Sequence, residues 1–304
     1  MRQNQFSRRE ILKNSAVGFG YLALNSLLAE EANAASDPLS AKVPPLLPRA
    51  KRVIFLFMKG GPSHVDTFEY KPKLQKDDGK PLPFKKPRVQ FAKTGNLLRS
   101  PWKFRQYGES GSWVSELFPN VAECVDDLCF LHSVHGTNAA HGGALLKLHT
   151  GSDSFVRPSM GAWVSYGLGT ENRNLPGFVT ICPTLAHGGV NNWGSAFLPA
   201  VYQGTPIGNA CIPSKQAKLR YIKSEKGNAE QQLDLLKEMN REHQDRVGAH
   251  RDLEARIQTF ELAFRMQTEM PKIEDLSSES KATKQLYGLD EKMTEDFGRQ
   301  CLLA

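Results

Sequence analysis

Six consecutive apolar residues, Val53 to Met58, constrain the fold of this chain more than any other stretch. The run is too short for a helix that must bury itself. Uninterrupted apolar runs of this length are typical of strands that are covered on both faces of a parallel sheet. Gly60, Gly61 and Pro62 follow, and such residues end a strand in a turn. The sequence therefore predicts a buried strand and an α/β fold.

Three polar residues, Ser63, His64 and Asp66, come after this turn and lie within one helical turn of each other. Their side chains have metal-binding or nucleophilic chemistry. In open α/β sheets, ligands bind beyond the carboxyl ends of the strands, so the position favours a functional site. The alternative from this segment alone is a tight turn in which Ser63 and Asp66 only cap the next element.

The first 35 residues have the features of an export signal. The segment SRREILK, with the pair Arg8 and Arg9, resembles the twin-arginine signal, with Ile11 where that signal usually has Phe. The apolar stretch from Ala16 to Ala29 is too short and too mild to span a bilayer and fits the core of a signal peptide. We therefore predict a signal peptide over 1–35, export by the twin-arginine machinery, and a periplasmic or secreted protein. The alternative is a basic amphipathic N-terminus.

Composition excludes several classes of partner. The net charge of +7 is modest and scattered, without a basic stripe interleaved with aromatic residues, so we do not expect nucleic acid to bind. No later segment approaches transmembrane length, so we expect no stable membrane span. The five cysteines lack the paired spacing of a structural zinc site and are expected to be small buried residues, although Cys182 and Cys211 can pair outside the cytoplasm.

The rest of the chain predicts one folded domain after a short connection. Prolines between 36 and 49 predict a linker, which leaves 50–304 for the domain. Apolar runs at Leu128 to Val134 and at Phe178 to Cys182 predict a second and a third strand, and helical spacing between Ser115 and Asp127 predicts a helix.

A histidine- and glycine-containing segment follows the second predicted strand. Thr137 or Asn138 can cap a helix that runs to His149 and ends at Gly151. Asn138 and His141 would then lie at the helix N-terminus, where free backbone N–H groups and the helix dipole favour an anion. We expect His149 to pack against the core, because a single histidine on an apolar helix face is more often a core residue than a ligand.

Three further helical regions are recognisable. A short helix is predicted within Arg157 to Gly169, and a pair of helices within Asn228 to Met270, with a break at Gly248 and a stop at Pro271. Thr294 to Ala304 begins an amphipathic helix without a C-cap. Only three strands are visible, where a sheet usually has about five or six. The sequence therefore predicts the N-terminal part of a longer protein.

Several long motifs occur in a fixed order: GGPSHVDTF, HTG, RPSMGAWVSYGLGTENRNLPGFV and WGSAFLPAVYQGT. From about Arg49 to Ala304 they resemble the exported bacterial domain-of-unknown-function 1501 (DUF1501) family, which is related in fold to alkaline phosphatases and sulfatases. The resemblance implies an alkaline-phosphatase-like doubly wound α/β sheet with helices on both faces and a metal site at its carboxyl end. It also implies that the C-terminal part of the domain is missing, because the family's DFGRQCLLA segment starts a helix that continues.

The resemblance also implies a metal ligand. In the wider superfamily the first strand delivers an Asp that binds a divalent metal ion, and Asp66 is the matching residue, although it lies several positions later than usual. His64 is then a second ligand or a hydrogen-bond partner, and Ser63 a residue that contacts substrate. The remaining ligands would lie beyond Ala304.

The helix that ends at Thr150-Gly151 matches the helix at whose start a sulfatase places its nucleophilic Cys. The matching start in this chain is His141, not Cys or Ser. Thr137 is close enough to serve as the nucleophile, and Asn138 is positioned to bind substrate. The resemblance thus makes Thr137 and His141 the catalytic candidates.

Taken together, these features predict an exported, metal-dependent, hydrolase-like protein that acts on sulfate or phosphate esters of small molecules or polysaccharides. The alternative is a non-catalytic exported protein on the same fold that binds carbohydrate or the cell envelope, because fold does not imply function.

Overall fold

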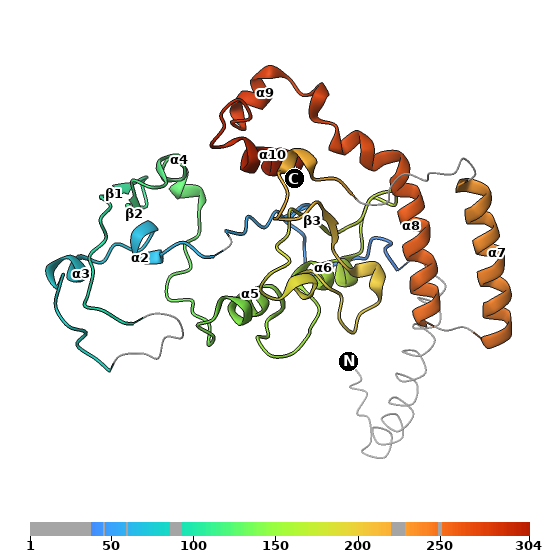
Figure 1. Ribbon diagram of the computed structural model, residues 1–304, viewed down its shortest axis with the longest axis horizontal. Coiled ribbons are helices and arrows are strands. Elements are labelled where there is room, and N and C mark those ends of the chain that lie inside the picture. Colours follow the sequence, from blue (N-terminus) through green and yellow to red (C-terminus); the bar gives the residue numbers. More distant parts are fainter. Residues whose placement is uncertain (1–37, 45, 59, 86–92, 220–228, 249–250) are drawn as a thin grey trace, which may run out of the picture. The chain divides into compact units, whose positions relative to one another are not determined.

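The computed structural model describes residues 38–44, 46–58, 60–85, 93–219, 229–248 and 251–304 (Figure 1). The predicted signal peptide over 1–35 therefore lies outside the described residues. The described residues form two compact units: Ala50–Leu148, and 38–49 together with His149–Ala304. Both mix short strands with helices, so the coarse α/β prediction is confirmed, with small sheets in place of one large sheet.

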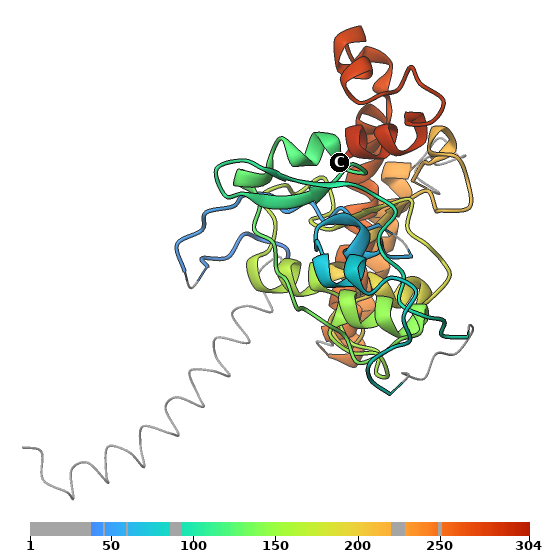
Figure 2. The same ribbon diagram turned by 90° about the vertical axis from the view of Figure 1, so that its left-hand side faces the viewer.

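The Ala50–Leu148 unit is built around an antiparallel ribbon (Figures 1 and 2). Strands β1 (Phe104–Tyr107) and β2 (Ser112–Ser115) pair with Phe104 opposite Ser115. The Asp126 carboxylate accepts the backbone N–H groups of Glu109 (2.8 Å) and Ser110 (2.9 Å) and so holds the turn between the strands. The helical elements of this unit are short: α2 (His64–Thr67), α3 (Pro72–Lys76), α4 (Pro119–Ala122) and the 3-10 turn η1 (Val125–Asp127).

The core of this unit is small. Val114, Ala122 and Val125 are buried, and aromatic side chains that include Phe68 and Phe118 pack against them. The predicted helix between Ser115 and Asp127 is replaced by β2, α4 and η1. Pro119 explains the interruption, because the residue before a proline is kept out of the helical region, and Phe118 has a non-helical ψ of 58°.

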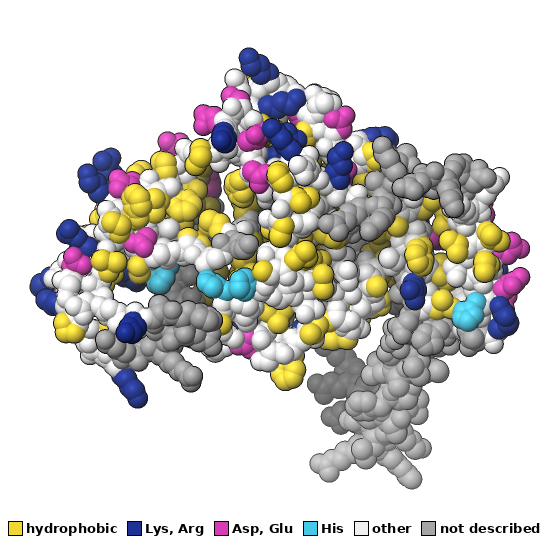
Figure 3. Space-filling view, in the orientation of Figure 1, with side chains coloured by type: hydrophobic (Ala, Val, Ile, Leu, Met, Phe, Trp, Pro, Cys, Tyr) yellow, Lys and Arg dark blue, Asp and Glu magenta, His cyan; other side chains and the backbone are white. Residues whose placement is uncertain are grey.

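Two of the three predicted strands are wrong for this structure. Neither Val53 to Met58 nor Leu128 to Val134 has regular secondary structure. Their apolar side chains are largely exposed, with Val53 75% and Leu131 76% accessible, and Figure 3 shows hydrophobic side chains exposed in several places on one face. A parallel strand needs neighbours that take its backbone hydrogen bonds and layers that cover both faces. In the described part of this unit, β1 and β2 pair with each other instead.

The larger unit contains a parallel strand pair. β3 (Val179–Ile181) pairs with β4 (Thr205–Ile207), with Val179 opposite Thr205 and Ile181 opposite Ile207. β3 confirms the third predicted strand. The remaining elements of this unit are α6 (Met160–Leu168), α7 (Ala229–Val247), α8 (Arg251–Glu274), α9 (Lys281–Leu286), α10 (Glu295–Leu303) and 3-10 turns at Gly189–Asn192 (η2), Ala200–Tyr202 (η3), Ser214–Gln216 (η4) and Leu276–Ser278 (η5).

One face of α8 forms the centre of the larger core. Leu262, Met266 and Met270, each four residues from the next, are buried against η3 and β4. The predicted break at Gly248 is confirmed, because Gly248 follows α7 with a φ of +80°. The predicted stop at Pro271 is wrong: Pro271 lies inside α8, in its last turn, where it lacks the N–H that would donate to the carbonyl four residues earlier.

The helix predicted within Arg157 to Gly169 is α6. The Ser159 hydroxyl accepts the N–H of Ala162 at its start, and Gly169, at φ +70°, ends it. The predicted linker over 36–49 is partly packed on this helix. Leu39 is buried and accepts the Thr170 N–H (2.8 Å), so the proline-rich composition concealed an ordered contact.

Two absences concern the described residues. None of their helices is long and apolar enough to cross a membrane. The five cysteines are free, so the pairing of Cys182 with Cys211 is not formed, and Cys124, Cys129 and Cys211 are exposed rather than buried.

Candidate functional site

The glycine turn before α2 forms as predicted and presents Ser63, His64 and Asp66. Gly60 and Gly61 have φ values of +90° and +72°, a region that side-chain-bearing residues rarely adopt, and the Gly61 N–H donates to the Met58 carbonyl (3.2 Å). Ser63 precedes α2 in an extended conformation, and the Asp66 N–H donates to its carbonyl (3.0 Å). The Ser63 side chain does not cap α2, so one part of the simple turn interpretation is wrong.

The Asp66 carboxylate is held by hydroxyl groups. Hydrogen bonds from Ser100 and, less strongly, from Ser63 hold the pKa of Asp66 below its usual value, and the nearby His64 lowers it further. Asp66 is therefore ionised at neutral pH. Ser100 lies 34 positions further along the chain, so no local sequence pattern predicts this contact.

These residues do not make a complete metal site by themselves. In the part of the chain that the structure describes, no group of three or more His, Cys, Asp or Glu side chains is arranged to hold a metal ion. Asp66 and His64 offer two donors, whereas protein-bound divalent ions usually take about four or more ligands. The described donor set therefore does not fit a metal ion without additional ligands.

The second group of predicted residues lies at the start of α5 (His141–Thr150). This helix was predicted, and Gly151, at φ +78°, follows its last residue. Asn138 precedes this helix. Its Oδ1 accepts the N–H of Ala140 (2.9 Å), two residues on, and so stabilises the turn before α5. His141 is exposed at the first helical position.

A lysine that sequence analysis did not select reaches this turn. Lys147 lies two turns into α5, and its Nζ donates to the Thr137 hydroxyl at 2.6 Å. The structure thereby joins the nucleophile candidate Thr137 to a cation. The position of Lys147 in the sequence does not predict that its side chain contacts a residue ten positions earlier.

His149, near the end of α5, is half-buried. Burial lowers the pKa of its imidazole, because a buried cation loses hydration. His149 is therefore mainly neutral at pH 7.

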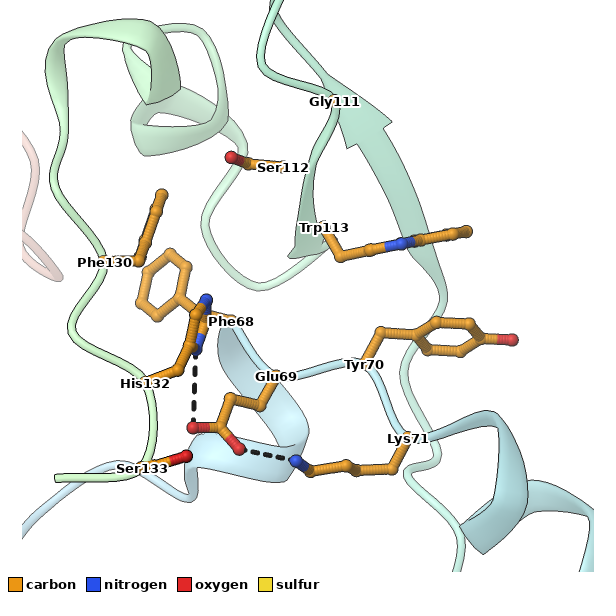
Figure 4. A pocket seen from close by; sticks show the side chains of 10 residues that line it. All are labelled: Phe68, Glu69, Tyr70, Lys71, Gly111, Ser112, Trp113, Phe130, His132 and Ser133. Carbon is orange, nitrogen blue, oxygen red and sulfur yellow. Dashed lines mark ion pairs between the residues drawn. The ribbon is translucent and has the colours of Figure 1, made fainter. Parts of the chain in front are cut away.

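A pocket of about 310 Å³ also lies in the Ala50–Leu148 unit, lined by the ten residues that Figure 4 labels. They come from the end of α2, from the start of β2 and from the segment after η1. No local sequence pattern predicts this pocket, because its walls join three segments that are up to 65 residues apart. Its aromatic walls and its central carboxylate, Glu69, are visible in Figure 4.

Comparisons with known proteins place the chain in a family. The family model described as "Protein of unknown function (DUF1501)" matches residues 50–304, which is most of the chain. No curated protein and no solved structure matches.

Proposed function

The chain belongs to the DUF1501 family, whose function is unknown, and within that family we propose that it is an exported hydrolase-like protein acting on sulfate or phosphate esters. The observation that carries the proposal is the hydrogen bond from Lys147 Nζ to Thr137 Oγ1 (2.6 Å) at the start of α5. It brings a cation and a hydroxyl together at a helix N-terminus.

The chemistry of such a contact suits an oxyanion ester. A hydroxyl is a weak nucleophile and needs a neighbour that removes its proton or stabilises the resulting alkoxide. The Lys147 ammonium favours the alkoxide form of Thr137 electrostatically. The N-terminus of α5 attracts negative charge through its backbone N–H groups and its dipole. A sulfate or phosphate group held there would place its central atom next to the Thr137 oxygen.

The other predicted residues have supporting roles in the proposal. His141, exposed at the first position of α5, is the second catalytic candidate, as donor to the leaving group. Asn138 and Ser63 would contact the substrate. Asp66 and His64 would contribute two ligands of a divalent metal ion, which when bound polarises an ester oxygen. Because the described donors do not complete a metal site, no step of the reaction is assigned to the metal.

The proposal extends to fold and location. We propose an alkaline-phosphatase-like doubly wound sheet with helices on both faces, and a twin-arginine signal peptide that delivers the protein to the periplasm or the exterior. The order of the motifs supports the fold. The pair Arg8 and Arg9 supports the export route.

The test is hydrolysis of an aryl sulfate and an aryl phosphate by the full chain, with divalent metal salts present. We expect Thr137→Ala to lower kcat by about 100-fold or more, Thr137→Ser to retain most activity, and Lys147→Met to lower kcat substantially. Lys73→Met, on the exposed helix α3, is the matched control and should leave the rate unchanged.

Two results would contradict the proposal. Equal rates for wild type and Thr137→Ala would remove Thr137 from the reaction. A wild-type protein that hydrolyses neither ester would favour the alternative, a non-catalytic exported protein that binds carbohydrate or the cell envelope.

A further inference from the structure

The pocket in Figure 4 has aromatic residues on two sides of a polar floor. On one side, the rings of Tyr70 and Trp113 are 4.4 Å apart with an angle of 30° between their planes. On the other side, Phe68 packs against Phe130 (5.3 Å), and Phe130 is stacked on His132 (5.9 Å). Trp113 is 38% exposed, so part of its indole is available to a ligand.

The floor of the pocket is a neutralised set of charges. The two oxygens of Glu69 contact different side chains: Lys71 Nζ lies 2.7 Å from Oε2, and His132 Nδ1 lies 3.4 Å from Oε1. His64 Nε2 is also 4.0 Å from Oε2. The hydrogen bond from Lys71 is the main reason that the pKa of Glu69 lies below its usual value. The carboxylate is therefore charged at neutral pH and already has its counter-ion.

This combination selects the chemistry of a ligand. An anionic group would need a cation without a partner, and Lys71 is paired with Glu69. A purely apolar ligand would cover Glu69, Lys71 and His132 without replacing their hydrogen bonds to water, which is costly. A ligand with flat apolar faces and a rim of uncharged hydroxyl groups satisfies both constraints. Its faces can lie on the aromatic rings, while its hydroxyls donate to Glu69 and accept from Lys71 and Ser112.

We propose that this pocket is a binding site for an uncharged carbohydrate. A sugar ring has apolar C–H faces and hydroxyls at its edge, and the volume of about 310 Å³ lies at the low end of small-molecule pockets, enough for one or two rings. The lining includes neither Thr137 nor Lys147, so the proposal stands whether or not the protein is a hydrolase.

The experiment is titration calorimetry of the full chain with uncharged glucose, galactose and N-acetylglucosamine, each as monomer and as tetramer. A sulfated tetramer and a medium-chain fatty acid are the competing ligand classes. We expect saturable binding of at least one uncharged sugar. If the tetramer binds more tightly than the monomer, the natural ligand is a polysaccharide chain. If the monomer binds equally well, the natural ligand is a free sugar.

Variants assign the binding to the pocket. Trp113→Ala should weaken sugar binding by about ten-fold or more, since a buried aromatic contact is commonly the largest single contribution to affinity. Trp113→Phe keeps a flat ring and should retain most of the affinity, which separates loss of contact from loss of fold. Trp102→Ala is the matched control, because Trp102 lies in the same unit with a similar exposure of 41% and does not line the pocket.

The proposal is overturned if none of the uncharged sugars binds saturably, if only the sulfated tetramer or the fatty acid binds, or if Trp113→Ala and Trp102→Ala bind the sugar equally well. Glu69→Gln gives a further check: it preserves shape but removes the charge that accepts hydroxyl hydrogen bonds, so we expect weaker sugar binding with an unchanged circular dichroism spectrum.

Discussion

Replacing Met270 by Ala tests whether α8 organises the larger unit. Met270 is 2% exposed and belongs to the stripe with Leu262 and Met266 that packs on η3 and β4. The substitution removes three side-chain heavy atoms from a closed environment, and buried Met→Ala changes cost about 2–5 kcal/mol because transfer and cavity terms add. For a unit of this size, we expect the melting temperature to fall by about 2–4 °C for each kcal/mol.

The assay is thermal unfolding followed by circular dichroism at 222 nm, where the long helices α7 and α8 dominate the signal. The two units need not unfold together, so the shift is read from the helical transition alone. Phe260→Ala, on the same helix but 54% exposed, is the control and should change the stability by about 0.5 kcal/mol or less. If both variants shift the transition equally, α8 is not packed as described.

Two further predictions concern charge and export. The Ser214 N–H donates to Asp296 Oδ1 (2.6 Å), and this hydrogen bond is the main reason that the pKa of Asp296 lies below its usual value. The ionised carboxylate therefore stabilises the folded state. This stabilisation is complete above the unfolded pKa of about 3.9 and is lost as the pH falls through the folded pKa. In urea titrations, Asp296→Asn should lower the free energy of unfolding by about 1 kcal/mol near neutral pH, after allowance for solvent screening. The difference from wild type should shrink below pH 4. A difference that is independent of pH would show that the charge of Asp296 is not the cause of the lost stability. Replacing Arg8 and Arg9 by Lys preserves charge but removes the guanidinium geometry, so the periplasmic fraction of the protein should fall sharply; normal export of the double variant would show that the signal was misread.

The sequence by itself determined the structural features that depend only on residues close together in the chain, such as helix ends and turns. Ser159 and Gly169 mark the ends of α6 because a hydroxyl cap and a left-handed glycine act within one turn. Gly248 separates α7 from α8 for the same reason. The turn at Gly60 and Gly61, α5, β3 and the family were also accessible from local patterns and motif order.

Tertiary structure alone decided which segments far apart in the chain meet. The apolar run Val53 to Met58 has the composition of a buried strand, but burial requires pairing and covering layers that the run cannot supply itself, and it is exposed here. The same holds for the candidate sites. Ser100 reaches Asp66, Lys147 reaches Thr137, and His132 reaches Glu69 across 34, 10 and 63 positions of the chain. Such contacts leave no periodic pattern in the sequence, because they depend on how the whole intervening segment folds to bring the two residues together.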